Sequence, residues 1–150
     1  MFLVIHVLLG ALIGVSFSSA SLVFALAFVS HFFLDVIPHW DNNFDLASFK
    51  KSFEVKINKS LVFTVLADFF LALFLSFLLF DILGNWLVFV GAFAAMLPDI
   101  LKLGYFTPLK RNKWYRKHLL FHAHIQKEVP LGIGILTQVV TVLILIYLLF

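Results

Sequence analysis

Long apolar stretches constrain this chain more than any other feature of its sequence. Five of them run roughly over residues 2–18, 21–37, 60–80, 86–101 and 131–150. A helix needs about 20 residues to cross a hydrocarbon core of ~30 Å, and these stretches lack the strict alternation of a membrane barrel. With 63% hydrophobic and 13% charged residues, the chain has too little polar surface to coat a soluble globule. The sequence therefore predicts an all-α, polytopic membrane helical bundle of about five transmembrane helices, forming one integral membrane domain over residues 1–150.

Basic residues are confined to two loops of this arrangement. All eleven Lys and Arg residues lie within residues 50–59 and 102–127. With five spans, both loops share a side with the N-terminus, and the positive-inside rule makes that side cytoplasmic. Basic residues placed in this way report orientation and contact with anionic lipid. We therefore expect membrane lipid, and not nucleic acid, as the partner.

The first apolar stretch has an alternative interpretation as a secretory signal peptide, since Ser18, Ser19 and Ala20 could form a cleavage site. It lacks a basic segment before the apolar residues, however, and His6 lies within it. Gly10 and Gly14 have the small-xxx-small spacing that lets two membrane helices approach closely. We expect this stretch to form a tight hairpin with the second one.

The densest group of ionisable side chains lies at the end of the second stretch. His31, Asp35, His39 and Asp41 fall within eleven residues. His31 and Asp35 are four apart, so on a helix they share a face and could hold one ion. Pro38 disfavours helix at the residue before it, and we expect the turn to carry His39 and Asp41 to the water-facing end of the helix. This pattern predicts a metal site, with a purely structural His–Asp hydrogen bond as the alternative.

Two further carboxylates lie within or beside apolar stretches. Asp68 lies eight residues into the third stretch with no cation in its own segment, so it must find a partner on another helix. Asp99 follows Pro98, which is expected to open the helix and free a backbone carbonyl near its cytoplasmic end. A protonated, hydrogen-bonded carboxyl is the structural alternative for Asp68, and a simple loop exit is the alternative for Asp99.

The remaining histidines are His6 in the first stretch and His118, His122 and His124 in the second basic loop. Apolar neighbours of the last three predict a short amphipathic helix at the membrane interface. The three imidazoles cannot all face one site, and we expect His122 to point inward. For His118 and His124, an exposed position on a simple surface helix is the alternative to a place in the site. His6 is equally suited to bind a metal or to donate a hydrogen bond to another helix.

These motifs resemble those of the YdjM-like membrane-bound metal-dependent hydrolases. The family is marked by an early His near small residues, a Leu-Pro-Asp segment, a turn that contains His, and a Ser-His-x-x-x-Asp helix. The corresponding positions here are His6, Leu97-Pro98-Asp99, His118 with His122, and Ser30-His31 with Asp35. The Ser-His segment comes early in this chain and not late. The resemblance implies metal-dependent chemistry in a prokaryotic cytoplasmic (inner) membrane.

We assign the metal to His31, Asp35, Asp99 and His122, with His39 and His6 as further candidate ligands. Because the chain has no Cys, the ligands are imidazoles and carboxylates, which suit zinc best, and also manganese or iron. The expected chemistry is metal-assisted hydrolysis, in which an Asp outside the metal site accepts a proton from water. Asp68 and Asp41 are the candidates for this base.

Five basic residues of the second loop could attract an anionic phospholipid or a lipid-linked phosphate. They are Lys110, Arg111, Lys113, Arg116 and Lys117. Determination of topology alone is the alternative role for them, and the sequence slightly favours it.

Two other functions remain compatible with the sequence. A metal-ion or proton carrier also needs intramembrane His and Asp, although carrier sites usually lie between repeats, and this chain has no evident repeat. A non-catalytic helical scaffold could use the polar cluster only to lock its bundle. A zinc protease is not expected, since the chain contains no His-Glu-x-x-His motif.

Overall fold

The computed structural model describes residues 1–40 and 44–150, and within these ranges all regular structure except one isolated β-bridge is helical. The prediction of an all-α fold is confirmed. The elements in chain order are α1 (Leu3–Ser16), α2 (Ala20–Val36), α3 (Leu46–Ser52), α4 (Lys59–Leu83), α5 (Trp86–Lys102), the 3₁₀ turns η1 (Leu103–Phe106) and η2 (Pro108–Arg111), α6 (Lys113–Ile125) and α7 (Leu131–Leu149).

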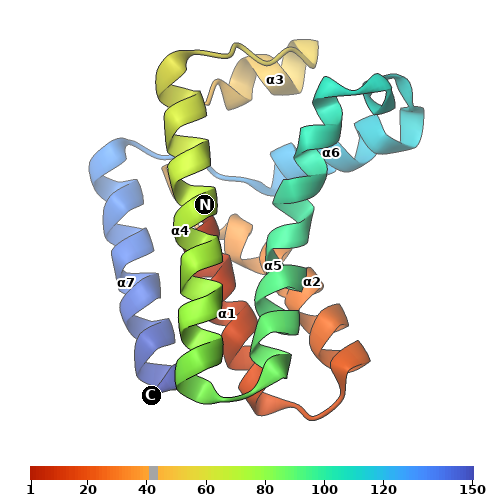
Figure 1. The fold of residues 1–150 in the computed structure, drawn as a ribbon. Helices are drawn as coiled ribbons and strands as arrows, with labels where there is room; N and C mark the ends of the chain where they lie inside the picture. The colour runs from red at the N-terminus through yellow and green to blue at the C-terminus, as the bar shows by residue number, and fades with distance from the viewer. Residues whose placement is uncertain (41–43) are drawn as a thin grey trace.

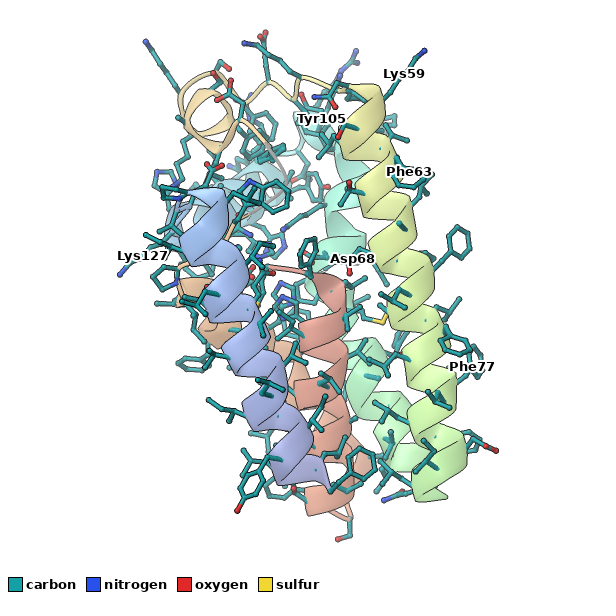
Figure 2. All side chains as sticks on the ribbon, turned by 90° about the vertical axis from the view of Figure 1, so that its left-hand side faces the viewer. Lys59, Phe63, Asp68, Phe77, Tyr105 and Lys127 are labelled. Carbon is teal, nitrogen blue, oxygen red and sulfur yellow. The ribbon has the colours of Figure 1, made fainter. Side chains whose placement is uncertain are left out.

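Among the described residues, three helical segments are long and apolar enough to cross a membrane: α4 with 25 residues, α5 continued through η1 with 21, and α7 with 19. Their outer faces are apolar, as a bilayer requires. On α4, Phe63 is 74% exposed and Phe77 is 53% exposed, and both point away from the bundle (Figure 2). The other two apolar helices, α1 and α2, have 14 and 17 residues. At about 1.5 Å per residue they are shorter than a hydrocarbon core of ~30 Å.

Helix α1 forms the centre of the bundle, with α2, α4, α5 and α7 arranged around it (Figure 1). Its closest neighbour is α5. Cβ atoms added at Gly10 or Gly14 would overlap the α5 backbone at Gly91 and Leu87 respectively. The prediction that Gly10 and Gly14 serve a tight hairpin between the first two stretches is therefore wrong, because these glycines lie against α5 and not α2. The glycines serve the contact with α5, because α5 contributes a glycine of its own at the same crossing.

The start of α1 lies partway down the bundle, and its first backbone N–H groups bond to side chains of other helices. Leu3 N donates to Asp68 Oδ2 at 2.7 Å, Val4 N to Asp68 Oδ1 at 3.4 Å, and Phe2 N to Gln138 Oε1 at 2.9 Å. Asp68 lies roughly 13 Å along α4 from Lys59 and points toward the start of α1 (Figure 2). Side chains from α4 and α7 thus replace water at this helix start, which is why α1 can be so short.

The elements that carry the basic residues gather at one end of the bundle (Figure 1). There α3 and α6 pack through an apolar cluster that includes Leu46, Phe49, Leu119 and Ala123. The amphipathic helix predicted around His118–His124 is present as α6. Below α3 and α6, the bundle helices enclose the polar residues of the candidate site.

The α1–α5 crossing generates a stability prediction. We expect Gly10→Ala to lower the free energy of unfolding by about 1–3 kcal/mol, because the new methyl group must push two backbones apart. Gly132→Ala on α7 is the matched control, since a Cβ there meets no atom within 4 Å. Denaturant unfolding in detergent micelles measures both. Equal stability of the two variants would contradict the close approach of α1 and α5.

Candidate metal centre

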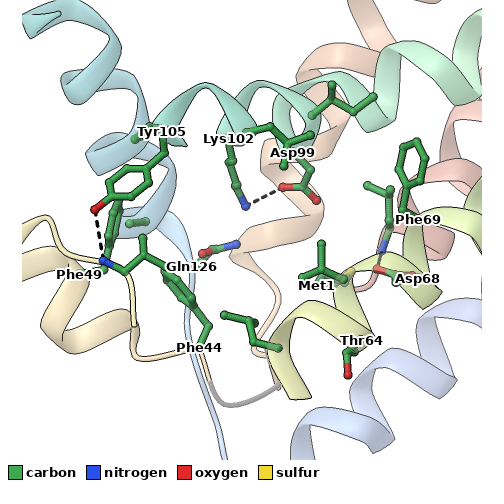
Figure 3. Close-up of a pocket in the computed structure, with 18 of the residues that line it drawn as sticks. Met1, Phe44, Phe49, Thr64, Asp68, Phe69, Asp99, Lys102, Tyr105 and Gln126 are labelled. Atoms are coloured by element: carbon green, nitrogen blue, oxygen red, sulfur yellow. Dashed lines mark hydrogen bonds and ion pairs between the residues drawn. The ribbon is translucent and has the colours of Figure 1, made fainter. Parts of the chain in front are cut away.

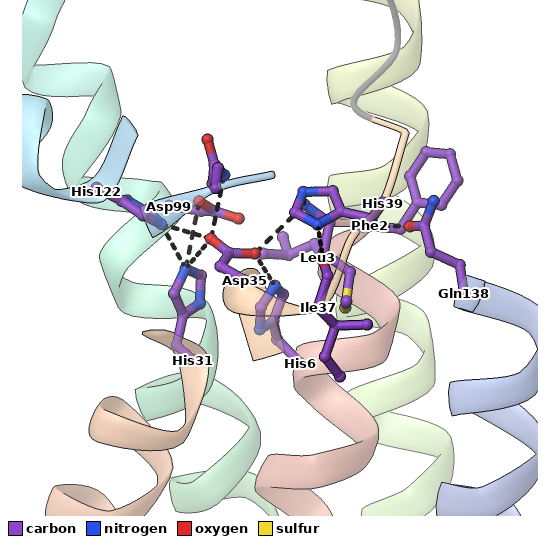
Figure 4. A network of polar contacts seen from close by, with 12 residues as sticks. Phe2, Leu3, His6, His31, Asp35, Ile37, His39, Asp99, His122 and Gln138 are labelled. Atoms are coloured by element: carbon purple, nitrogen blue, oxygen red, sulfur yellow. Dashed lines mark hydrogen bonds and ion pairs between the residues drawn. The ribbon is translucent and has the colours of Figure 1, made fainter. Parts of the chain in front are cut away.

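Four ionisable side chains from three helices converge inside the bundle (Figure 4). They are His31 and Asp35 of α2, Asp99 of α5 and His122 of α6, and one ligand atom from each lies within 4.8 Å of all the others. His31 and Asp35 share a face of α2 because they are one helical turn apart. Packing of α5 and α6 against α2 brings in the other two. This group could hold a metal ion.

The spacing of the ligand atoms suits coordination to one ion. His31 Nε2 lies 3.4 Å from Asp35 Oδ2 and 3.6 Å from Asp99 Oδ1. His122 Nε2 lies 3.1 Å from His31 Nε2 and 2.6 Å from Asp35 Oδ2. Bonds of about 2.0–2.1 Å in a tetrahedral zinc site put neighbouring ligand atoms roughly 3.3 Å apart. The group therefore needs adjustments of only a few tenths of an ångström at most of these separations.

A backbone carbonyl determines which ring nitrogen of His31 carries a proton. His31 Nδ1 lies 2.7 Å from the carbonyl oxygen of Ala95, and a carbonyl can only accept, so Nδ1 carries the proton. In the neutral imidazole, Nε2 then has a lone pair that faces Asp35, Asp99 and His122. Such a bond orients an imidazole for metal binding. Pro98 was expected to open the helix, but α5 continues through it to Lys102. Proline cannot donate to the carbonyl of Ala94, four residues earlier, whereas the carbonyl that His31 uses belongs to the next residue, Ala95.

The site is almost completely shielded from solvent. His31 and Asp35 are fully buried and His122 is 1% exposed. Burial, with the nearby ammonium of Lys102 as the next cause, lowers the pKa of His122 to about 4. Its imidazole is therefore neutral at neutral pH, which is the form that binds a metal.

Asp35 has partners on both of its oxygens. Gln126 Nε2 donates to Oδ2 at 3.1 Å, beside His31 and His122. On the other side, His6 Nε2 and the Met1 nitrogen each lie 3.4 Å from Oδ1. His6 is fully buried and stacks on His31, with ring centroids 3.9 Å apart. His6 and Asp35, two of the predicted ligands, thus lie at the centre of the network.

Asp99 connects the group to a cavity. Its side chain is 22% exposed, and its Oδ1 lies 2.6 Å from Lys102 Nζ. Both residues line a cavity of about 420 Å³ whose walls are mainly apolar (Figure 3). Asp68 and Gln126 add further polar groups to the lining. A molecule in this cavity would therefore have direct access to one edge of the group.

His39 was expected at the water-facing end of α2, and this expectation is wrong. His39 is 1% exposed, and its Nδ1 donates to the Ile37 carbonyl at 2.7 Å. Its backbone pairs with the segment after α6, through His39 N to Lys127 O at 3.1 Å and Val129 N to His39 O at 3.2 Å. After Pro38 the chain therefore runs beside the segment that follows α6, and His39 stays buried instead of reaching water.

Other predicted residues lie apart from the four-residue group. Asp68 lines the cavity but uses its carboxylate at the start of α1, and Asp41 lies outside the described residues. His118 is partly buried, with its Nε2 atom in the interior, whereas His124 is exposed on the surface of α6.

The five predicted substrate-binding residues Lys110, Arg111, Lys113, Arg116 and Lys117 are exposed, and within the described chain they do not line this cavity. Four of the five lie over aromatic rings.

Sequence reasoning missed three residues that matter here. Gln126 holds Asp35, Lys102 pairs with Asp99 in the cavity, and Gln138 joins α7 to the start of α1 and to the Trp40 carbonyl. Only Gln138 had a usable signal, as an amide inside an otherwise apolar stretch. The other two belong to the second basic stretch of the sequence, residues 102–127, where polar residues are common.

Comparison of the chain with models of known protein families, with curated proteins and with solved structures gives no match.

The position of Asp68 generates a prediction that separates its structural and chemical roles. We expect Asp68→Ala to lower the free energy of unfolding by about 0.5–2 kcal/mol, because the first N–H groups of α1 lose their acceptor. Bound metal should be retained. Asp81→Ala, which removes an exposed carboxylate from the same helix, is the control. Denaturant unfolding and elemental analysis of both variants test this, and unchanged stability in Asp68→Ala would contradict the capping role.

Proposed function

We propose that this chain is a membrane-embedded, metal-dependent hydrolase that acts at the cytoplasmic face on a phospholipid or a lipid-linked phosphoester. The observation that carries the proposal is the convergence of His31, Asp35, Asp99 and His122 beside an apolar cavity. Buried imidazoles and carboxylates with facing lone pairs repel one another unless a cation or a proton lies between them. An ion in this position would be open to a ligand on the cavity side.

The proposal includes the topology. All five apolar helices belong to the membrane domain, and the N-terminus faces the cytoplasm. In support, the Lys and Arg residues belong to the elements gathered around α3 and α6 at one end of the bundle, as the positive-inside rule requires. The prokaryotic inner membrane and a distant relationship to the YdjM-like hydrolases complete the proposal.

The cavity favours a lipid as the substrate. Its lining is largely apolar and includes residues of α4, whose outer face is suited to lipid, so an acyl chain would be well solvated there. Lys102 lies in the same lining and could bind a phosphate while it remains close to Asp99. This is a better position for an anionic headgroup than the exposed basic residues of η2 and α6.

Zinc, or alternatively manganese or iron, would supply a Lewis acid that polarises a phosphoester and acidifies water near neutral pH. Residues of the protein would hold the ion and accept the proton. His31, Asp35, Asp99 and His122 would hold the ion, and Gln126 would orient Asp35. Asp68 is the described carboxylate that could accept a proton in the cavity, and Asp41 remains the other candidate base.

Elemental analysis of the detergent-purified protein tests the metal site. We expect stoichiometric zinc, manganese or iron in the wild type and a large loss in His31→Ala and Asp35→Asn, because each removes a buried ligand. His124→Ala is the matched control on an exposed imidazole. Membrane insertion should be unchanged in all variants.

The outcomes separate the functions. Wild-type protein without metal after several reconstitution conditions would favour a scaffold. Full metal occupancy in His31→Ala and Asp35→Asn would show that these two residues are not ligands. Uptake of the metal into vesicles would favour a carrier.

Hydrolysis of phospholipids in mixed micelles tests the substrate class. We expect Lys102→Gln to raise KM about tenfold or more while metal content is retained, because a charge-assisted contact to phosphate is lost. Lys110→Gln removes an exposed charge and is expected to leave KM nearly unchanged. Equal effects of the two variants would argue against headgroup binding by Lys102.

A further inference from the structure

We propose a second cation site beside the first, in which Asp35 bridges two ions through its two carboxylate oxygens. The inference rests on the proposed function, since the second ion would share Asp35 with the ion proposed for the first four ligands. The second ion would be held by His6, Asp35 and His39.

His6 is the first observation that points to this site. Its side chain is fully buried, and neither ring nitrogen has a hydrogen-bond partner within the described residues. An imidazole without partners in the interior is costly unless it binds something. Its Nε2 lies 3.4 Å from Asp35 Oδ1 in an arrangement that does not meet hydrogen-bond geometry. The ring of His6 therefore faces the carboxylate without forming a hydrogen bond to it.

The two sides of Asp35 are the second observation. Oδ2 faces His31, His122 and Gln126, which belong to the first site. Oδ1 faces His6 and the Met1 nitrogen instead. The rings of His6 and His31 stack with an interplanar angle of 18°, and each presents Nε2 to a different oxygen of the same carboxylate (Figure 4). A carboxylate flanked in this way can bind one cation with each oxygen.

His39 supplies the third ligand. Because its Nδ1 donates to the Ile37 carbonyl, its Nε2 carries a lone pair. In the structure this lone pair accepts a hydrogen bond from the Met1 nitrogen, which also lies 3.4 Å from Asp35 Oδ1. The Met1 nitrogen thus links His39 to the Oδ1 side, and an ion bound between them would have to displace this nitrogen.

Two imidazoles and one carboxylate form a ligand set typical of a catalytic divalent ion, with a position left for water or substrate. Paired ions about 3.5–4 Å apart are common in enzymes that cleave phosphoesters, where they stabilise the attacking and leaving oxygens together. The ligand class of the new site is therefore a divalent transition metal, the same as for the first.

The ratio of metal to protein tests the proposal in the full-length, detergent-purified chain loaded with zinc. We expect two ions in the wild type and in the control His124→Ala. His6→Ala and His122→Ala should each retain one ion, because each disables one side of Asp35. The double variant His6→Ala/His122→Ala should retain none.

A ratio of one in both the wild type and His6→Ala would overturn the second site and leave the proposed function intact. Loss of the only ion in His6→Ala would also overturn it, because His6 would then belong to the first site. A ratio of zero in the wild type would overturn the proposed function itself.

A second measurement guards against misfolding of the His6 variant. Wild-type protein loaded with manganese should give the electron paramagnetic resonance spectrum of two coupled ions, and an uncoupled spectrum at full loading would contradict the bridged pair.

Discussion

The site depends above all on the carboxylate of Asp35, which is fully buried. A charge in a low-dielectric interior requires close partners, and these come from separate parts of the chain. His31 lies on the same helix, His122 on α6, Gln126 just beyond α6 and His6 on α1. Because these side chains all meet at one carboxylate, α1, α2 and α6 are linked to one another at this point. The requirement to stabilise one charge thus organises the polar centre of an otherwise apolar bundle.

A second constraint is the need to satisfy backbone groups away from water. Helix α1 begins at the level of Asp68, and its first N–H groups bond to Asp68 and Gln138. This start leaves room above α1 for the cavity that α3, α4 and α6 help to line. The short first helix, the cavity and access to Asp99 therefore have a common physical origin. The same geometry explains how an apolar molecule could meet polar residues inside the bundle.

Several parts of the site could be predicted from spacing alone. His31 and Asp35 are one helical turn apart, and His122 was expected on the inward face of α6, where it lies. The direction taken by His39 could not be predicted, because its burial depends on pairing with the segment around Glu128. Gly10 was recognised as a close-packing residue, but its partner Gly91 lies far away in the sequence. Local rules describe single helices well and say little about which helices meet.

Hydropathy and charge distribution were sufficient to predict an all-α chain with helices suited to a membrane, since burial of backbone polar groups in lipid leaves few other solutions. Helical spacing was also sufficient to nominate most of the buried imidazoles and carboxylates. Tertiary structure alone decided that Asp68 serves the start of α1, that Lys102 and not the outer basic residues lies beside Asp99, and that Gln126 holds Asp35. The reason is that a side chain's role depends on the electrostatic partners that packing brings to it, and these partners lie far from it along the chain.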